Sequence, residues 1–99
     1  MKVTFLGTEC KVEFLKYADN DRVAIRLICC DDSAIMAMAT VNLPGVNLKK
    51  DQVCIKDYSE NRGMLKVLVE AKIVEDTGLI AHSGFVTVPI CKVICPVEA

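Results

Sequence analysis

The sequence predicts a small α+β domain, in which an antiparallel β-sheet of about five to six strands carries one α-helix on one face. Three observations lead to this class. Apolar and polar residues alternate along several short segments, turn-forming residues separate those segments closely, and one later segment has a helical period. Hydrophobic residues make up 53% of the 99-residue chain and charged residues 25%. That balance is typical of a folded protein, and the length fits a single domain spanning residues 1–99.

The first half of the chain contains four predicted strands. In the third of them, Val23, Ile25 and Leu27 alternate with Ala24 and Arg26, so the two sets should face opposite sides of a sheet. Turn residues separate the second strand from the third, which predicts a hairpin between them. The four expected strands cover residues 2–6, 10–17, 22–30 and 35–43, and Pro44-Gly45 ends the last one.

A helical period replaces the alternation after a short strand at residues 53–56. Asp57 and Glu60 have the spacing of a capping box, with Ser59 as a second candidate cap. Gly78 is expected to cap the other end. We therefore expect a helix over residues 60–73, a short extended segment at 79–81 and a last strand at 85–93. The apolar stripe of this helix consists of Met64, Leu65, Leu68, Val69 and Ile73.

Charge and composition argue against two classes of partner. The formal net charge is −1, lysine and arginine are scattered, and Trp is absent, so neither a basic patch nor a base-stacking platform is expected for nucleic acid. The longest apolar runs are far shorter than the roughly 20 residues that a membrane helix needs. The N-terminal residues lack the apolar stretch of a signal peptide. We therefore expect a cytoplasmic protein that binds neither nucleic acid nor membrane.

The six cysteines are expected to be reduced thiols without metal, because a cytoplasmic compartment is reducing. Most of them lie in strand-like apolar runs, where cysteine behaves as a small hydrophobe. Only Cys91 and Cys95 have a spacing that structural zinc permits, whereas such sites normally need two ligand pairs. We therefore predict no metal site and no cofactor.

From the turn at Asp19 onward the chain resembles a known family of small proteins carried on bacterial conjugative elements and phages, a domain of unknown function. The resemblance covers nearly the whole chain and implies no activity. It rests on residues 17–20 (Tyr-Ala-Asp-Asn), 23–27 (Val-Ala-Ile-Arg-Leu), 39–44 (Ala-Thr-Val-Asn-Leu-Pro), 55–61 (Ile-Lys-Asp-Tyr-Ser-Glu-Asn), 68–71 (Leu-Val-Glu-Ala), 73–78 (Ile-Val-Glu-Asp-Thr-Gly) and 84–86 (Gly-Phe-Val).

Two segments depart from the pattern of that family. Residues 33–38 read Ser-Ala-Ile-Met-Ala-Met, where the family usually has a polar turn of the kind Gly-Glu-Pro followed by an aromatic residue. Residues 79–82 read Leu-Ile-Ala-His, where the family usually has Arg and Thr before a Pro. Both changes introduce apolar residues. They are either natural divergence or an engineered interface, and the sequence does not decide between the two.

No catalytic site is predicted. Asp76-Thr77-Gly78 matches the tripeptide of aspartic proteases, but that mechanism needs an apolar strand-loop and a symmetric partner aspartate. We expect this tripeptide to end the helix instead. His82 is the single histidine and lies in no motif. The alternative to a non-enzymatic protein is a small accessory enzyme or ligand-binding protein that uses His82 with a nearby carboxylate.

One apolar surface exceeds what a single helix can cover. The predicted strand at residues 35–43 is apolar on both faces, because Ile35 and Ala37 belong to one face and Met36 and Met38 to the other. The departing segment at residues 79–82 is apolar as well. Soluble monomers rarely expose large contiguous apolar patches. We therefore predict a non-enzymatic interaction module that forms a homo-oligomer or binds another protein, and we expect the two segments to meet at one end of the sheet. The predicted interaction surface consists of Ile35, Met36, Met38, Leu79 and Ile80.

Overall fold

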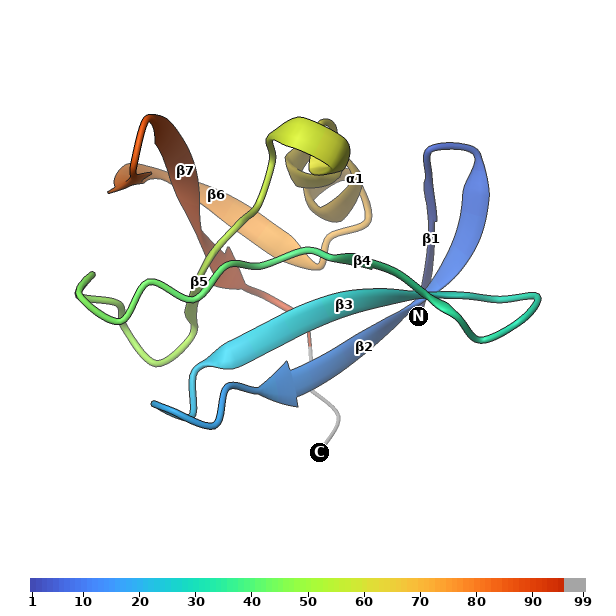
Figure 1. The fold of residues 1–99 in the computed structure, drawn as a ribbon, viewed down its shortest axis with the longest axis horizontal. Helices are drawn as coiled ribbons and strands as arrows, with labels where there is room; N and C mark the ends of the chain where they lie inside the picture. The colour runs from blue at the N-terminus through green and yellow to red at the C-terminus, as the bar shows by residue number, and fades with distance from the viewer. Residues whose placement is uncertain (96–99) are drawn as a thin grey trace.

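The computed structural model describes residues 1–95, and four of its strands form a first antiparallel sheet in the order β1-β2-β3-β4 (Figure 1). Leu6-Gly7 connects the first two strands in a tight turn with positive φ at both residues, which permits a short hairpin loop. The three predicted strands before residue 31 are confirmed to within about two residues at each end. The strands are β1 (Lys2–Phe5), β2 (Thr8–Lys16), β3 (Val23–Cys29) and β4 (Ile35–Met38).

A second antiparallel sheet contains three strands in the order β5-β7-β6. Its strands are β5 (Gln52–Cys54), β6 (Val74–Ser83) and β7 (Val86–Val93). The expected short extended segment at residues 79–81 is therefore part of a ten-residue strand. Figure 1 shows β6 and β7 as a hairpin that projects on the side of the molecule away from β1.

A narrow backbone connection joins the two sheets. Thr40 forms an isolated bridge with Ile55, Lys56 N–H donates to Ala39 C=O at 2.8 Å, and Val41 N–H donates to Cys54 C=O at 3.0 Å. The segment just after β4 thus runs along the outer side of β5. The α+β class is confirmed and the strand number is close to the five to six expected, but the strands divide into two linked sheets.

The helix is shorter than predicted at both ends. A 3₁₀ turn, η1 (Ser59–Asn61), precedes α1 (Met64–Glu70). Asp57 does cap the helix, since its Oδ1 accepts hydrogen bonds from Gly63 N–H at 3.1 Å and Leu65 N–H at 2.9 Å. The predicted capping box is wrong, because the Glu60 carboxylate pairs instead with Lys56 Nζ at 2.6 Å.

The C-terminal boundary of the predicted helix is also wrong. Lys72 has a φ of 59°, a left-handed conformation that takes the chain out of the helix after Glu70. Ile73 is fully buried outside the helix, and Asp76-Thr77-Gly78 lies within β6. Gly78 therefore does not cap the helix.

The buried hydrophobic residues form two cores. The larger core contains side chains from both sheets and from α1, whose Met64 and Leu68 are fully buried. Val69 was predicted in the same apolar stripe, but it is 38% exposed, so it borders solvent. A smaller core forms where Cys54, Ala81, Val88 and Ile90 contact the residues that follow β4. Within residues 1–95 no helix has the length and apolar character that crossing a membrane requires.

Candidate functional site

A β-bulge decides which side chains of β4 are exposed. Ala37 is opposite Leu27, but Ile28 is opposite Ile35, so Met36 is the extra residue in the ladder. The prediction placed Ile35 on the face of Ala37 and Met36 on the face of Met38. The bulge reverses this assignment, because it turns Ile35 to the outer face and lets Met36 pack against the larger core. Ile35 is 60% exposed and Met38 is 37% exposed.

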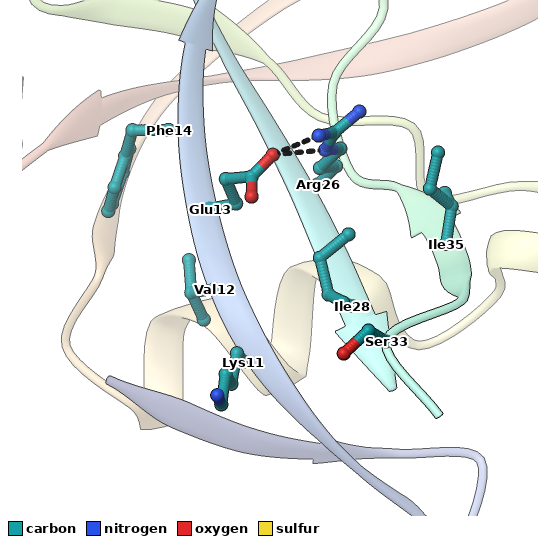
Figure 2. Close-up of a pocket in the computed structure, with 8 residues that line it drawn as sticks. All are labelled: Lys11, Val12, Glu13, Phe14, Arg26, Ile28, Ser33 and Ile35. Carbon is teal, nitrogen blue, oxygen red and sulfur yellow. Dashed lines mark hydrogen bonds and ion pairs between the residues drawn. The ribbon is translucent and has the colours of Figure 1, made fainter. Parts of the chain in front are cut away.

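Ile35 borders an open groove on the outer side of the first sheet, with a volume of about 750 Å³ (Figure 2). Its polar centre is an ion pair, in which Nε and Nη2 of Arg26 both contact Oε1 of Glu13. These two residues are direct cross-strand neighbours on β2 and β3, so the sheet register holds the pair in place. The residues that line the groove are Lys11, Val12, Glu13, Phe14, Arg26, Ile28, Ser33 and Ile35.

The chemistry of this groove is limited by that ion pair. Glu13 neutralises the Arg26 guanidinium, so neither group is free to bind a charged ligand without breaking the pair. Ser33 contributes a hydroxyl, but a serine nucleophile needs an adjacent base within hydrogen-bond reach. The histidine of the chain lies in the other sheet. The groove is thus a mixed apolar and polar depression.

Leu79 and Ile80 lie on β6, at the edge of the second sheet, whereas Ile35 and Met38 lie on the first sheet. The two segments were expected to meet at one end of a single sheet. This expectation is wrong, because they lie on separate sheets. Leu79 is 56% exposed and Ile80 is 59% exposed. Being consecutive in a strand, they point to opposite faces of the second sheet.

A second bulge precedes this apolar pair. Asp76 is opposite Cys91 and Leu79 is opposite Ile90, so Thr77 and Gly78 are extra residues in β6. Thr77 Oγ1 donates to Ile90 C=O at 2.6 Å and accepts from Leu79 N–H at 3.2 Å. Gly78 has a φ of 81°, which a residue without a side chain adopts at little cost. The bulge separates the acidic first part of β6 (residues 74–76) from its apolar second part (residues 79–83).

The second part of β6 presents unpaired backbone groups at the open edge of the sheet. Pro89 C=O accepts from Ile55 N–H at 3.0 Å, so the backbone polar groups of Pro89 point toward β5. Directly opposite residues in an antiparallel ladder point these groups either toward each other or away from each other. Ile80, opposite Pro89, therefore directs its N–H and C=O away from β7. His82, two residues on, does the same.

Phe85 is the most exposed of the large apolar residues that the sequence analysis missed. It occupies the two-residue turn Gly84-Phe85 between β6 and β7, and at 110% relative exposure it protrudes completely. Positive φ at Gly84 but not at Phe85 is the pattern of a type II′ turn. The pair Gly84-Phe85 between two apolar segments could have predicted this exposure from the sequence. The second position of such a two-residue turn points its side chain into solvent.

Four of the six thiols are poorly suited to nucleophilic attack. Burial raises the pKa of Cys10, Cys54 and Cys95 above the usual thiol value, and it raises the pKa of Cys91 to about 12. The thiolate is the reactive form, so these groups remain protonated at neutral pH. In the part of the chain that the structure describes, no three His, Cys, Asp or Glu side chains are grouped to hold a metal ion.

His82 is exposed and lies opposite Thr87, one residue before the end of β6. The carboxylates of the same strand, Glu75 and Asp76, lie beyond the bulge. Their partners on β7 are Lys92 and Cys91, which lie four to five residues from Thr87, so at about 3.3 Å per residue the strand separates them from His82 by roughly 13–17 Å. A catalytic pairing of His82 with these two carboxylates is therefore excluded by distance.

Comparison with known proteins gives one match. The model of a family described as a domain of unknown function, DUF4313, matches residues 11–94. No curated protein and no solved structure matches the chain.

Proposed function

We propose that this chain, which belongs to the DUF4313 family of domains of unknown function, is a non-enzymatic interaction module that binds an extended strand of a protein at the free edge of β6. One observation carries the proposal: the backbone groups of Ile80 and His82 point outward from an edge strand. Along the same edge, the side chains of Leu79, Ile80 and Phe85 are exposed. In strand addition, backbone hydrogen bonds give affinity and alternate side chains give specificity.

The other three sheet edges are less suited to accept a strand. The edge strand β1 has only four residues. The edge strand β4 is interrupted by its bulge, and Asn61 Nδ2 donates to Met38 C=O at 2.5 Å. The outer side of β5 is occupied by residues 39–41. Bulges, short strands and covering segments are the usual protections of an edge. Beyond its own bulge β6 is regular over residues 79–83, and no backbone hydrogen bond within residues 1–95 reaches the outward groups of Ile80 and His82.

A protein partner fits the charge and the side chains of this edge. Residues 79–83 contain no Asp, Glu, Lys or Arg, and the chain has a net charge of −1, which offers little to a nucleic acid backbone. Leu79 and Ile80 point to opposite faces, so an added strand would contact an apolar side chain on each side. Both segments that depart from the resembled pattern, residues 33–38 and 79–82, contain exposed apolar side chains.

The resemblance to proteins of conjugative elements and phages suggests the kind of partner. For a natural chain, we propose that the role is to block or modulate a host protein. If the departing segments were engineered, the role is assembly itself. Of the predicted surface residues on the first sheet, Ile35 and Met38 are exposed, and β4 is the candidate for a second contact.

Selection from a display library of short random peptides tests the proposed function. Selected peptides should bind the wild-type chain and lose at least tenfold in affinity with Ile80→Pro. Proline removes the outward N–H at this position and keeps the β6–β7 ladder intact, because that N–H does not point toward β7. Ile80→Thr, which keeps the N–H, is the matched control and should lose less.

Nuclear magnetic resonance can locate the bound peptide. The amides of Ile80 and His82 should become protected from hydrogen exchange when the peptide binds. Peptides that bind Ile80→Pro as well as wild type would overturn the strand-addition proposal.

A further inference from the structure

We infer that the strand added to β6 is the β6 strand of a second copy of this chain, paired antiparallel about a twofold axis at Ala81. This inference rests on the proposed function, because it names the partner of the same edge. It starts from the outward backbone groups of Ile80 and His82, which are spaced two residues apart, as in one side of an antiparallel ladder.

The positions of these groups select the axis. With the axis at Ala81, Ile80 of each copy lies opposite His82 of the other, so all the outward groups of both residues find partners within regular strand. An axis at Ile80 would place Gly78 of the bulge in the ladder, and an axis at His82 would place Gly84 of the turn there. Both of these positions have a left-handed backbone, which a regular ladder does not accept.

The side chains are compatible with the same register. Ala81 would lie beside its own copy, where a small side chain avoids a clash. Leu79 would lie beside Ser83 on one face, and Ile80 beside His82 on the other. Residues 78–83 carry no Asp, Glu, Lys or Arg, so no like charges are brought together. The carboxylates of Glu75 and Asp76 fall outside the paired segment.

Phe85 adds a contact at each end of the paired strands. In this register Gly84 lies level with Gly78 of the other copy, so the fully exposed Phe85 ring is next to the partner's bulge. A Cβ added at Gly78 would meet no atom within 4 Å, so the surface there is open. Contact between the Phe85 ring and the bulge would cover an aromatic side chain that nothing in its own copy covers.

The area involved fits a small symmetric interface. Leu79, Ile80 and Phe85 expose 56%, 59% and 110% of their reference areas, which amounts to on the order of 400 Å² per copy for side chains of this size. A stable interface of standard size covers about 800 Å² per partner. Side chains contribute about half of that, and the paired backbones add to it, so we expect a dimer that depends on concentration.

Sedimentation velocity over a range of concentrations tests the dimer. The wild-type chain should shift from monomer to dimer as its concentration rises. Ile80→Pro should weaken dimerisation at least tenfold, whereas Ile80→Thr should retain it within a few fold. A thermal melt of both variants shows that each is folded. Wild-type chain that stays monomeric at millimolar concentration, or a dimer that Ile80→Pro leaves intact, would overturn the inference.

Engineered cysteines read the register independently. Directly opposite residues whose backbone groups point apart have Cα atoms about 4.5 Å apart, within disulfide range. Leu79 and Ser83 of the other copy form such a pair in the proposed register, and neither side chain is buried. Leu79→Cys combined with Ser83→Cys should therefore give a covalent dimer on mild oxidation, with the 79–83 link identified by mass spectrometry after digestion. Leu79→Cys alone is the control, because the two copies of position 79 are well separated in this register. Equal cross-linking of both variants argues against the axis at Ala81.

The two proposals can fail separately. If the chain selects peptides that require the Ile80 N–H but remains a monomer, strand addition stands and self-pairing is wrong. If the chain dimerises through an Ile80-dependent contact but selects no peptide, the edge is specific for its own sequence. The absence of both a dimer and a peptide would overturn both.

Discussion

Cys10 and Cys29 face each other across β2 and β3. Glu9 C=O accepts from Cys30 N–H at 3.0 Å, so the neighbouring Cys10–Cys29 pair has its backbone groups pointing apart. Such pairs have Cα atoms about 4.5 Å apart, and disulfides need roughly 4.4–6.8 Å. A cross-strand disulfide therefore fits at this position. Burial, together with Cys29, Cys30 and Glu9 nearby, raises the pKa of Cys10, so its thiolate is scarce at neutral pH.

We predict that the native protein carries six reduced thiols and no metal, and that a thiol oxidant such as diamide links Cys10 to Cys29 first. Native mass spectrometry should give the mass of the bare polypeptide, and oxidation should remove two hydrogens. Cys29→Ser should prevent that first loss. A stoichiometric zinc adduct in the native protein, or a first disulfide elsewhere, would contradict the prediction.

The sequence predicts part of this arrangement. A strand over residues 22–30 places Cys29 and Cys30 on opposite faces, and the short turn after β2 predicts the hairpin. The pairing of Cys10 with Cys29 depends on the register between the strands, which a period of two leaves open by any even shift. Residue-level pairing across strands therefore had to come from the structure.

At the scale of elements, α1 contributes its Leu68 side chain to the larger core, where Leu68 is fully buried. We predict that Leu68→Ala lowers the free energy of unfolding by about 2–5 kcal/mol, the usual range for a buried leucine. Val69→Ala is the matched control on the same helix, because Val69 is partly exposed. It should cost much less, and urea unfolding measures both. Equal losses for the two variants would mean that the helix is turned differently.

The errors at helix and strand boundaries have identifiable physical causes. The helical stripe includes Ile73 by spacing, but Lys72 leaves the helical conformation, and Ile73 is buried by the connection to β6. Gly78 was assigned to a helix end because a cap and a bulge both need positive φ. Met36 was assigned to the wrong face, because one extra residue in a strand inverts the alternation that follows it. None of these shifts is visible in a periodicity.

At the scale of the whole molecule, the class was predictable and the division into two sheets was not. Alternation, turn residues and one helical period predict α+β without knowledge of any long-range contact. The division depends on Thr40 and Ile55, which are far apart in sequence and form one isolated bridge. The predicted surface split for the same reason, because β4 and β6 lie in different sheets. Its residues Ile35, Met38, Leu79 and Ile80 are exposed, and Met36 packs against the core.

Cys91 connects the core to the stability of the whole molecule. It lies in β7, the central strand of the second sheet, and it is fully buried in the larger core. Burial is the main cause that raises the pKa of its thiol from 9.0 to about 12, and Asp76 adds to it. Between these two values the folded chain keeps the proton and the unfolded chain releases it.

We therefore predict that the protein loses stability in alkali through Cys91. Its contribution is fully present below pH 9 and is lost as the pH rises toward 12, because deprotonation then favours the unfolded chain. One released proton lowers the free energy of unfolding by up to about 1.4 kcal/mol per pH unit.

Urea unfolding of wild type and Cys91→Ala at pH 8, 9, 10 and 11 measures this effect. The variant should be less stable by a constant amount up to pH 9, because it leaves a small cavity. The difference in stability should shrink above pH 9, because only the wild type loses the contribution of Cys91. Other alkaline titrations affect both proteins alike and cancel in the comparison. Parallel curves across that range would show that Cys91 is not responsible.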